Sequence, residues 1–174
     1  MGIESLTDRQ VSLMISRYEE RELIEGGRYS LAELKMEQLR RVQSPLPYVE
    51  VARTIVELAT KSDDGLITYR DIWDAFRPGE PWRWPVSNNT VNPSLQRVVE
   101  YCVRNSLPIL TVLVVQEGKR KLSPEAVQNI FNEARALGVD VGHDAVAFID
   151  RERGRARNVV AANLPDDGIN SAAA

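Results

Sequence analysis

The sequence predicts a mainly α-helical protein with a small β component, in which a winged helix-turn-helix-like core carries an N-terminal helical hairpin and a C-terminal helix. Apolar residues recur at helical spacing through most of the chain, and several of these runs begin with a capping-box pattern. One β-branched run, 107–115, is too short for a helix and predicts a buried strand. Residues 65–138 therefore follow the order short strand, short helix, loop, longer helix, strand, basic turn, helix.

The N-terminal unit, 1–44, reads as two antiparallel helices. Thr7 followed by Gln10 predicts the first helix start, and Ser30 followed by Glu33 predicts the second. Each start leads into an apolar face, and Gly26-Gly27 separates the two helices. We expect a hairpin that serves dimerisation or a protein partner.

The winged-helix-like core is expected at 45–138. A strong amphipathic helix covers 47–61, and Thr68 with Asp71 predicts a brief helix after a short extended piece. The Pro- and Gly-rich stretch 77–89 predicts a long loop, after which Pro93 is expected in the first turn of the next helix. A C-terminal helix is then expected within 139–162, from about Asp144 to Ala161 and weakened at Gly154, followed by a disordered tail at 163–174.

Composition limits the classes of function. The chain has 174 residues, 43% of them hydrophobic and 27% charged, which is typical of one folded domain. No apolar run approaches the roughly 18 residues of a membrane span, and the N-terminus lacks a secretory pattern, so we expect a cytoplasmic protein with no membrane partner. One cysteine and one histidine exclude an internal disulfide and leave too few ligands for zinc, and no cofactor is expected.

Basic residues on the surface of the winged-helix-like unit, 45–138, predict contact with nucleic acid. Arg97, Tyr101 and Arg104 lie opposite the apolar stripe of the helix that Pro93 opens. In a winged helix, such a helix enters the DNA major groove while the basic turn touches phosphate. Lys119, Arg120 and Lys121 form that turn here. The overall charge of −3, from 22 basic and 25 acidic residues, argues against this interpretation unless the basic residues form a local patch.

The same segment resembles a known family. Ile67-Thr68-Tyr69 and the stretch 105–110, Asn-Ser-Leu-Pro-Ile-Leu, resemble motifs in the C-terminal domain of alkylguanine-DNA alkyltransferases and alkyltransferase-like proteins. The resemblance implies that Tyr69 works at a target phosphate, and it places Gln96 where the family inserts an arginine into the base stack. The family's Pro-Cys-His-Arg falls on 112–115, Val-Leu-Val-Val, so neither the nucleophile nor its histidine is present. The resemblance covers residues 65–138, which are 74 of the 174 residues.

Other unusual residues admit two interpretations. Trp82-Arg83-Trp84 either covers the core or presents a stacking surface to a base or a partner. Cys102 falls on an apolar stripe, where a buried thiol is inert, and His143 stands at a predicted helix start. No nucleophile and base, phosphate loop or metal cluster supports an enzyme.

Two hypotheses follow. The first is a non-enzymatic DNA-binding or regulatory protein that contacts double-stranded DNA through a set of polar and basic residues. The alternative is a protein interaction module, an adaptor or inhibitor, that uses the winged fold and Trp82, Arg83 and Trp84 to bind a protein partner. DNA binding predicts that Arg97, Lys119 and Arg120 share one positive face without acidic neighbours. The complete nucleic-acid set is Tyr69, Gln96, Arg97, Tyr101, Arg104, Lys119, Arg120 and Lys121.

Overall fold

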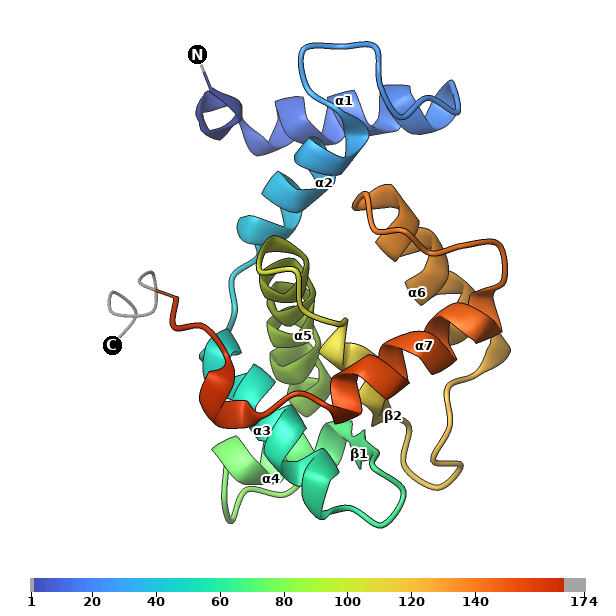
Figure 1. The fold of residues 1–174 in the computed structure, drawn as a ribbon. Coiled ribbons are helices and arrows are strands. Elements are labelled where there is room, and N and C mark those ends of the chain that lie inside the picture. The colour runs from blue at the N-terminus through green and yellow to red at the C-terminus, as the bar shows by residue number, and fades with distance from the viewer. Residues whose placement is uncertain (1, 168–174) are drawn as a thin grey trace.

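The computed structural model describes residues 2–167 and is mainly α-helical there, with one small parallel sheet (Figure 1). Within this range α2, α3, α4 and η2 pack against α5, which runs through the middle of the molecule. The α-helices are α1 (Asp8–Glu20), α2 (Leu31–Arg40), α3 (Tyr48–Lys61), α4 (Tyr69–Phe76), α5 (Val86–Arg104), α6 (Pro124–Ala136) and α7 (Ala145–Arg157). Short 3-10 turns are η1 (Ile3–Ser5), η2 (Leu110–Leu113) and η3 (Ala161–Asn163).

The N-terminal hairpin forms as predicted. Both capping boxes are present, and the Thr7 and Ser30 hydroxyls each accept the backbone N–H three residues later at 3.2 Å. Helices α1 and α2 bury a small apolar cluster of their own, and α2 also packs against α5. Figure 1 shows the pair at one end of the molecule, with α2 leading towards the core.

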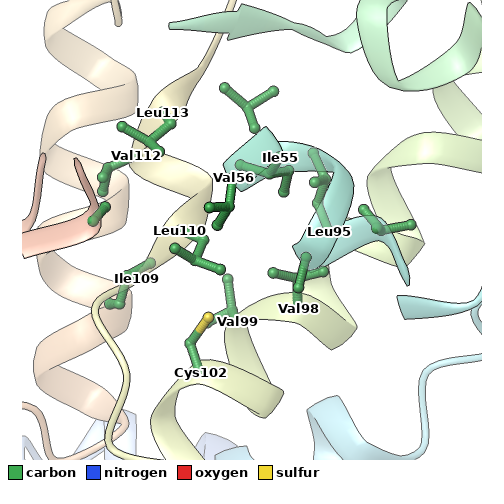
Figure 2. Close-up of a cluster of buried hydrophobic side chains, with 14 of the residues drawn as sticks. Ile55, Val56, Leu95, Val98, Val99, Cys102, Ile109, Leu110, Val112 and Leu113 are labelled. Carbon is green, nitrogen blue, oxygen red and sulfur yellow. The ribbon is translucent and has the colours of Figure 1, made fainter. Parts of the chain in front are cut away.

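The main core lies between α3, α5 and η2. Ile55, Val98, Cys102 and Leu110 are fully buried there, and Figure 2 shows these side chains facing one another. Helices α6 and α7 close the other side, where the rings of Phe131 and Phe148 meet edge to face. The hydrophobic stripes predicted for α3 and α5 are therefore the inner faces of these helices.

The strand predicted at 107–115 is wrong for most of its length. Residues Leu110–Leu113 form η2, and only β2 (Val114–Val115) is extended and paired, in parallel with β1 (Ile67–Thr68). The buried Glu152 carboxylate of α7 accepts the N–H of Ile109 at 2.8 Å. Because this N–H is bound to a side chain, it cannot join a strand ladder.

Helix α5 begins earlier than predicted. It starts at Val86, so Pro93 lies inside the helix and not in its first turn. The loop before it is closed by Ser87, whose hydroxyl accepts the N–H of Arg83 at 2.9 Å and whose own N–H donates to the Arg83 carbonyl. This local contact organises residues that the Pro-rich composition assigned to an irregular loop.

The C-terminal region also departs from prediction. Helix α7 starts after the Asp144 cap, as expected, but it continues through Gly154 without a break and ends earlier, at Arg157. Residues 163–167, predicted as part of a disordered tail, contact the core: Leu164 is buried and Asp167 accepts hydrogen bonds from Arg104 and Tyr48. The rest of that predicted tail, 168–174, lies outside the described residues.

Candidate nucleic-acid interface

Two adjacent hollows that share Tyr69 lie along one side of α5, and together we call them the α5 groove. The first has a volume of about 290 Å³ and lies between α4, the loop before α5 and the start of the 116–121 loop. The second has a volume of about 300 Å³ and lies between α5, β2 and α6. Residues distant in sequence thus meet on one surface.

Tyr69 holds its place because the start of α4 is fixed. The Thr68 hydroxyl accepts the N–H of Asp71 at 3.2 Å, and the Asp71 carboxylate accepts the Thr68 N–H at 2.6 Å. Tyr69 is therefore the first residue of a well-capped helix and lies against both hollows. Its surroundings exclude enough water that burial raises the pKa of its hydroxyl, which stays protonated and able to donate a hydrogen bond.

The Trp82-Arg83-Trp84 segment is partly packed on the core and partly exposed. Trp82 is half-buried and packs edge to face on Trp73, with ring centroids 6.2 Å apart. Trp84 is 76% exposed, and Arg83 is exposed beside it. Both indoles nevertheless line the first hollow next to Tyr69. One ring therefore anchors the segment while the other offers an aromatic surface.

Carboxamide side chains line the groove. Asn88, Asn92 and Gln96 follow one another at intervals of four on α5, so they share one face of the helix. Gln116 and Asn129 face them from beyond β2 and from α6. Of these residues, sequence reasoning identified only Gln96. The four-residue spacing of amides on α5 was the available signal, and it was hidden because the helix was expected to begin at Pro93.

Charge at the groove is mixed. Arg70 and Glu117 form an ion pair at 3.2 Å at the edge of the first hollow. Glu133 stands at the far end of the second hollow. Lys119 and Lys121 are exposed on the loop that Gln116 and Glu117 begin. The charged residues that line the groove are therefore one ion pair and one glutamate, and the two lysines of the adjoining loop make no ion pair with the described residues.

Arg120 differs from its two neighbours. Its guanidinium forms an ion pair with Asp64 at 2.7 Å and donates to the carbonyl of Leu66 at 2.8 Å. Hydrogen bonds from Arg120 and Ser62 hold the pKa of the Asp64 carboxyl well below its usual range. This arginine therefore ties the 116–121 loop to the turn before β1, and its charge is balanced by an acidic neighbour.

Arg97, Tyr101 and Arg104 face the other side of α5. Tyr101 is fully buried and donates to the carbonyl of Pro165 at 2.6 Å, and Arg104 pairs with Glu100 and Asp167 at 2.8 and 2.6 Å. Arg97 is only 11% exposed and donates to the Val42 carbonyl. The face of α5 that was predicted to contact nucleic acid is covered by the connection after α2 and by residues 164–167.

The structure thus divides the predicted set. Tyr69 and Gln96 lie together in the α5 groove with Trp82 and Trp84, whereas the three α5 residues Arg97, Tyr101 and Arg104 do not share that surface. Arg97 and Arg120 each have an acidic neighbour, Glu100 at 3.9 Å and Asp64 at 2.7 Å, so the single positive face predicted for them and Lys119 does not form.

The remaining chemical candidates lie elsewhere. Cys102 is fully buried, and burial raises the pKa of its thiol to about 12. His143 is exposed on the turn before α7, whereas the thiol lies inside the main core. Among residues 2–167, no three His, Cys, Asp or Glu side chains gather as metal ligands. Nor does any helix in that range combine the length and apolar character needed to cross a membrane.

Comparison with known proteins gives no assignment: no family model matches the chain, and neither a curated protein nor a solved structure matches it.

Proposed function

We propose that the protein is a non-enzymatic, winged-helix-type DNA-binding or regulatory protein whose nucleic-acid interface is the α5 groove. The observation that carries this proposal is the row of Asn88, Asn92 and Gln96 on one face of α5, beside Tyr69 and the exposed Trp84. Carboxamides both donate and accept hydrogen bonds and can pair with the edge of adenine, while an exposed indole can stack on a base.

The arrangement of elements supports the winged-helix interpretation. Helices α4 and α5 contact one another across the 77–85 loop, and α5 is the longer second helix that would enter a major groove. In this proposal the loop after β2 acts as the wing and carries Lys119 and Lys121 for phosphate contacts. This proposal no longer relies on a shared positive face of Arg97, Lys119 and Arg120, because Arg97 and Arg120 have acidic neighbours. Tyr69 and Gln96 stay in the nucleic-acid set, and Arg97, Tyr101 and Arg104 hold α5 in place.

The test is fluorescence anisotropy with labelled duplex and single-stranded DNA at about 50 mM and about 200 mM salt. The double variant Lys119→Ala/Lys121→Ala removes the two exposed lysines and spares Arg120, because that side chain fastens the loop to Asp64. Loss of two phosphate contacts lowers the slope of log affinity against log salt by about 1.8. The matched control is Arg9→Ala/Arg21→Ala, which removes two exposed cations from the N-terminal hairpin.

A second variant tests base contact separately. Asn92→Ala/Gln96→Ala leaves the charge unchanged, so we expect weaker binding with the same salt dependence and about 1–3 kcal/mol lost for each good base contact. Absence of DNA binding at low salt would refute the proposal. Equal DNA affinity in the lysine variant and the hairpin control would also contradict phosphate contacts by Lys119 and Lys121.

The protein interaction alternative rests on a different observation. Trp84 is 76% exposed and the neighbouring Val86 is 63% exposed, which leaves an apolar surface at the start of α5. If this surface binds a second copy, sedimentation should show a dimer that Trp84→Ala disrupts. Self-association of that kind, in a protein that does not bind DNA, would favour the alternative.

A further inference from the structure

A third hollow, separate from the two of the α5 groove, lies where the N-terminal hairpin joins the core. It has a volume of about 510 Å³, within the range of small-molecule sites. Its walls are the end of α2, the connection from Val42 to Pro47, the start of α3, and Arg97 on the back of α5. We call it the linker cavity. Three arginines and one carboxylate, Asp8, supply the charges on its surface.

Arg97 brings unused hydrogen-bond donors to this cavity. Its Nη1 donates to the Val42 carbonyl at 3.2 Å, and its guanidinium lies 4.5 Å from the centre of the Tyr48 ring. The Nε atom is buried and makes no hydrogen bond within the described part of the chain, and Nη2 is 3.9 Å from the Glu100 carboxylate. A buried donor without an acceptor is costly, so an acceptor in the cavity would stabilise this group.

Arg40 presents a second open guanidinium. Its Nε and Nη2 bind the two oxygens of Glu37 at 2.7 and 2.8 Å, while Nη1 makes no hydrogen bond to residues 2–167. The side chain is 43% exposed, so a ligand can reach it. Arg41 is different, because Glu37, Asp8 and the Leu6 carbonyl already occupy its donors. The structural ion pairs therefore account for Arg41 but not for all donors of Arg40 and Arg97.

We propose that the linker cavity binds a small phosphate-bearing organic anion, held by Arg40 and Arg97. A phosphate offers three acceptor oxygens and accepts bonds from two guanidinium groups at once, which a single carboxylate does less well. The apolar wall formed by Pro45, Leu46, Pro47 and Tyr48 leaves room for an organic group beside the phosphate. A bound anion would also join the hairpin to the core, since Arg40 lies on α2 and Arg97 lies on α5.

Isothermal titration calorimetry tests the site with inorganic phosphate, pyrophosphate, adenosine monophosphate and succinate at constant ionic strength. We expect saturable binding of the phosphate compounds, strongest for the nucleotide, and at least tenfold weaker binding of succinate. Arg40→Gln should weaken nucleotide binding at least tenfold, and its fold should persist because Glu37 keeps its bond to Arg41 at 2.6 Å. Arg53→Gln is the matched control, since Arg53 pairs with Glu50 and Asp166 outside the cavity.

Several results would overturn the inference. These are the absence of saturable binding by any phosphate compound, succinate binding as tight as that of the nucleotide, and equal nucleotide affinity in Arg40→Gln and Arg53→Gln. The DNA experiment is independent, because Arg40 lies outside the α5 groove. Arg40→Gln should therefore lose nucleotide binding and keep the DNA affinity of the parent chain, and loss of both together would also contradict a separate site.

Discussion

Glu152 should be a major source of stability, because its buried carboxylate joins α7 to the segment before β2. The side chain is 1% exposed, accepts the N–H of Ile109 at 2.8 Å, and pairs with Arg155 at 2.8 Å. A hydrogen bond to a charged group contributes about 1.5–3 kcal/mol. Arg155 is 48% exposed, so that pair adds no more than about 1 kcal/mol. Glu152→Ala should therefore lower the free energy of unfolding by about 3 kcal/mol.

Urea denaturation measures this loss, with an unchanged denaturant slope showing that the two end states are preserved. The melting temperature should fall by about 6–12 °C, at about 2–4 °C per kcal/mol for a chain of this length. Glu152→Gln retains an acceptor for Ile109 and should lose about half as much. Asp150→Ala removes an exposed carboxylate from the same helix and should change stability by less than about 0.5 kcal/mol. A loss below about 1 kcal/mol for Glu152→Ala would refute the reasoning.

Three further predictions follow from burial and charge. Leu110→Ala should cost about 2–5 kcal/mol in urea denaturation, because the side chain is fully buried in the main core, and a smaller loss would contradict tight packing there. The Cys102 thiol, with its pKa raised to about 12, should react with a thiol reagent only on unfolding, so rapid labelling of the native protein would be inconsistent with its burial. The Asp64 carboxyl has a folded-state pKa below its ordinary 3.8, so its pairing with Arg120 stabilises the protein above about pH 4 and this stabilisation is lost as pH falls further. Asp64→Asn should therefore reduce the dependence of unfolding on acid. An unchanged acid transition in this variant would count against the pairing.

Local signals in the sequence predicted the helix starts. Thr7, Ser30 and Thr68 each accept a backbone N–H three residues ahead, and Ser123 does the same before α6. Such bonds involve neighbours in sequence, so the pattern of residue types is sufficient to reveal them. The helical hairpin was predicted from the same helix starts and from the apolar face of each helix. In the structure these two faces form one buried cluster.

Contacts distant in sequence account for what was missed. The 107–115 run has the composition of a strand, but Glu152 binds the Ile109 N–H from 43 residues away and the chain turns into η2. Helical periodicity placed Tyr101 opposite the apolar stripe, yet the residue is buried. Its hydroxyl donates a hydrogen bond to the carbonyl of Pro165, 64 residues away. Periodicity identifies which residues share a helix face, but not whether a later segment covers it.

The two polar faces of α5 explain why only part of the candidate site followed from the sequence. Tyr101 and Arg104 bind partners within the protein, at Pro165 and Asp167, so these side chains position the helix. Asn92 and Gln96 line the groove and make no side-chain hydrogen bond to the described residues, so their hydrogen-bonding capacity remains for a ligand. In the sequence the arginines are the more obvious candidates, because a positive charge suggests phosphate contact and a neutral amide does not. In the fold the amides are the better candidates for recognition, since a group already engaged by its own chain must lose that contact before it can bind another molecule.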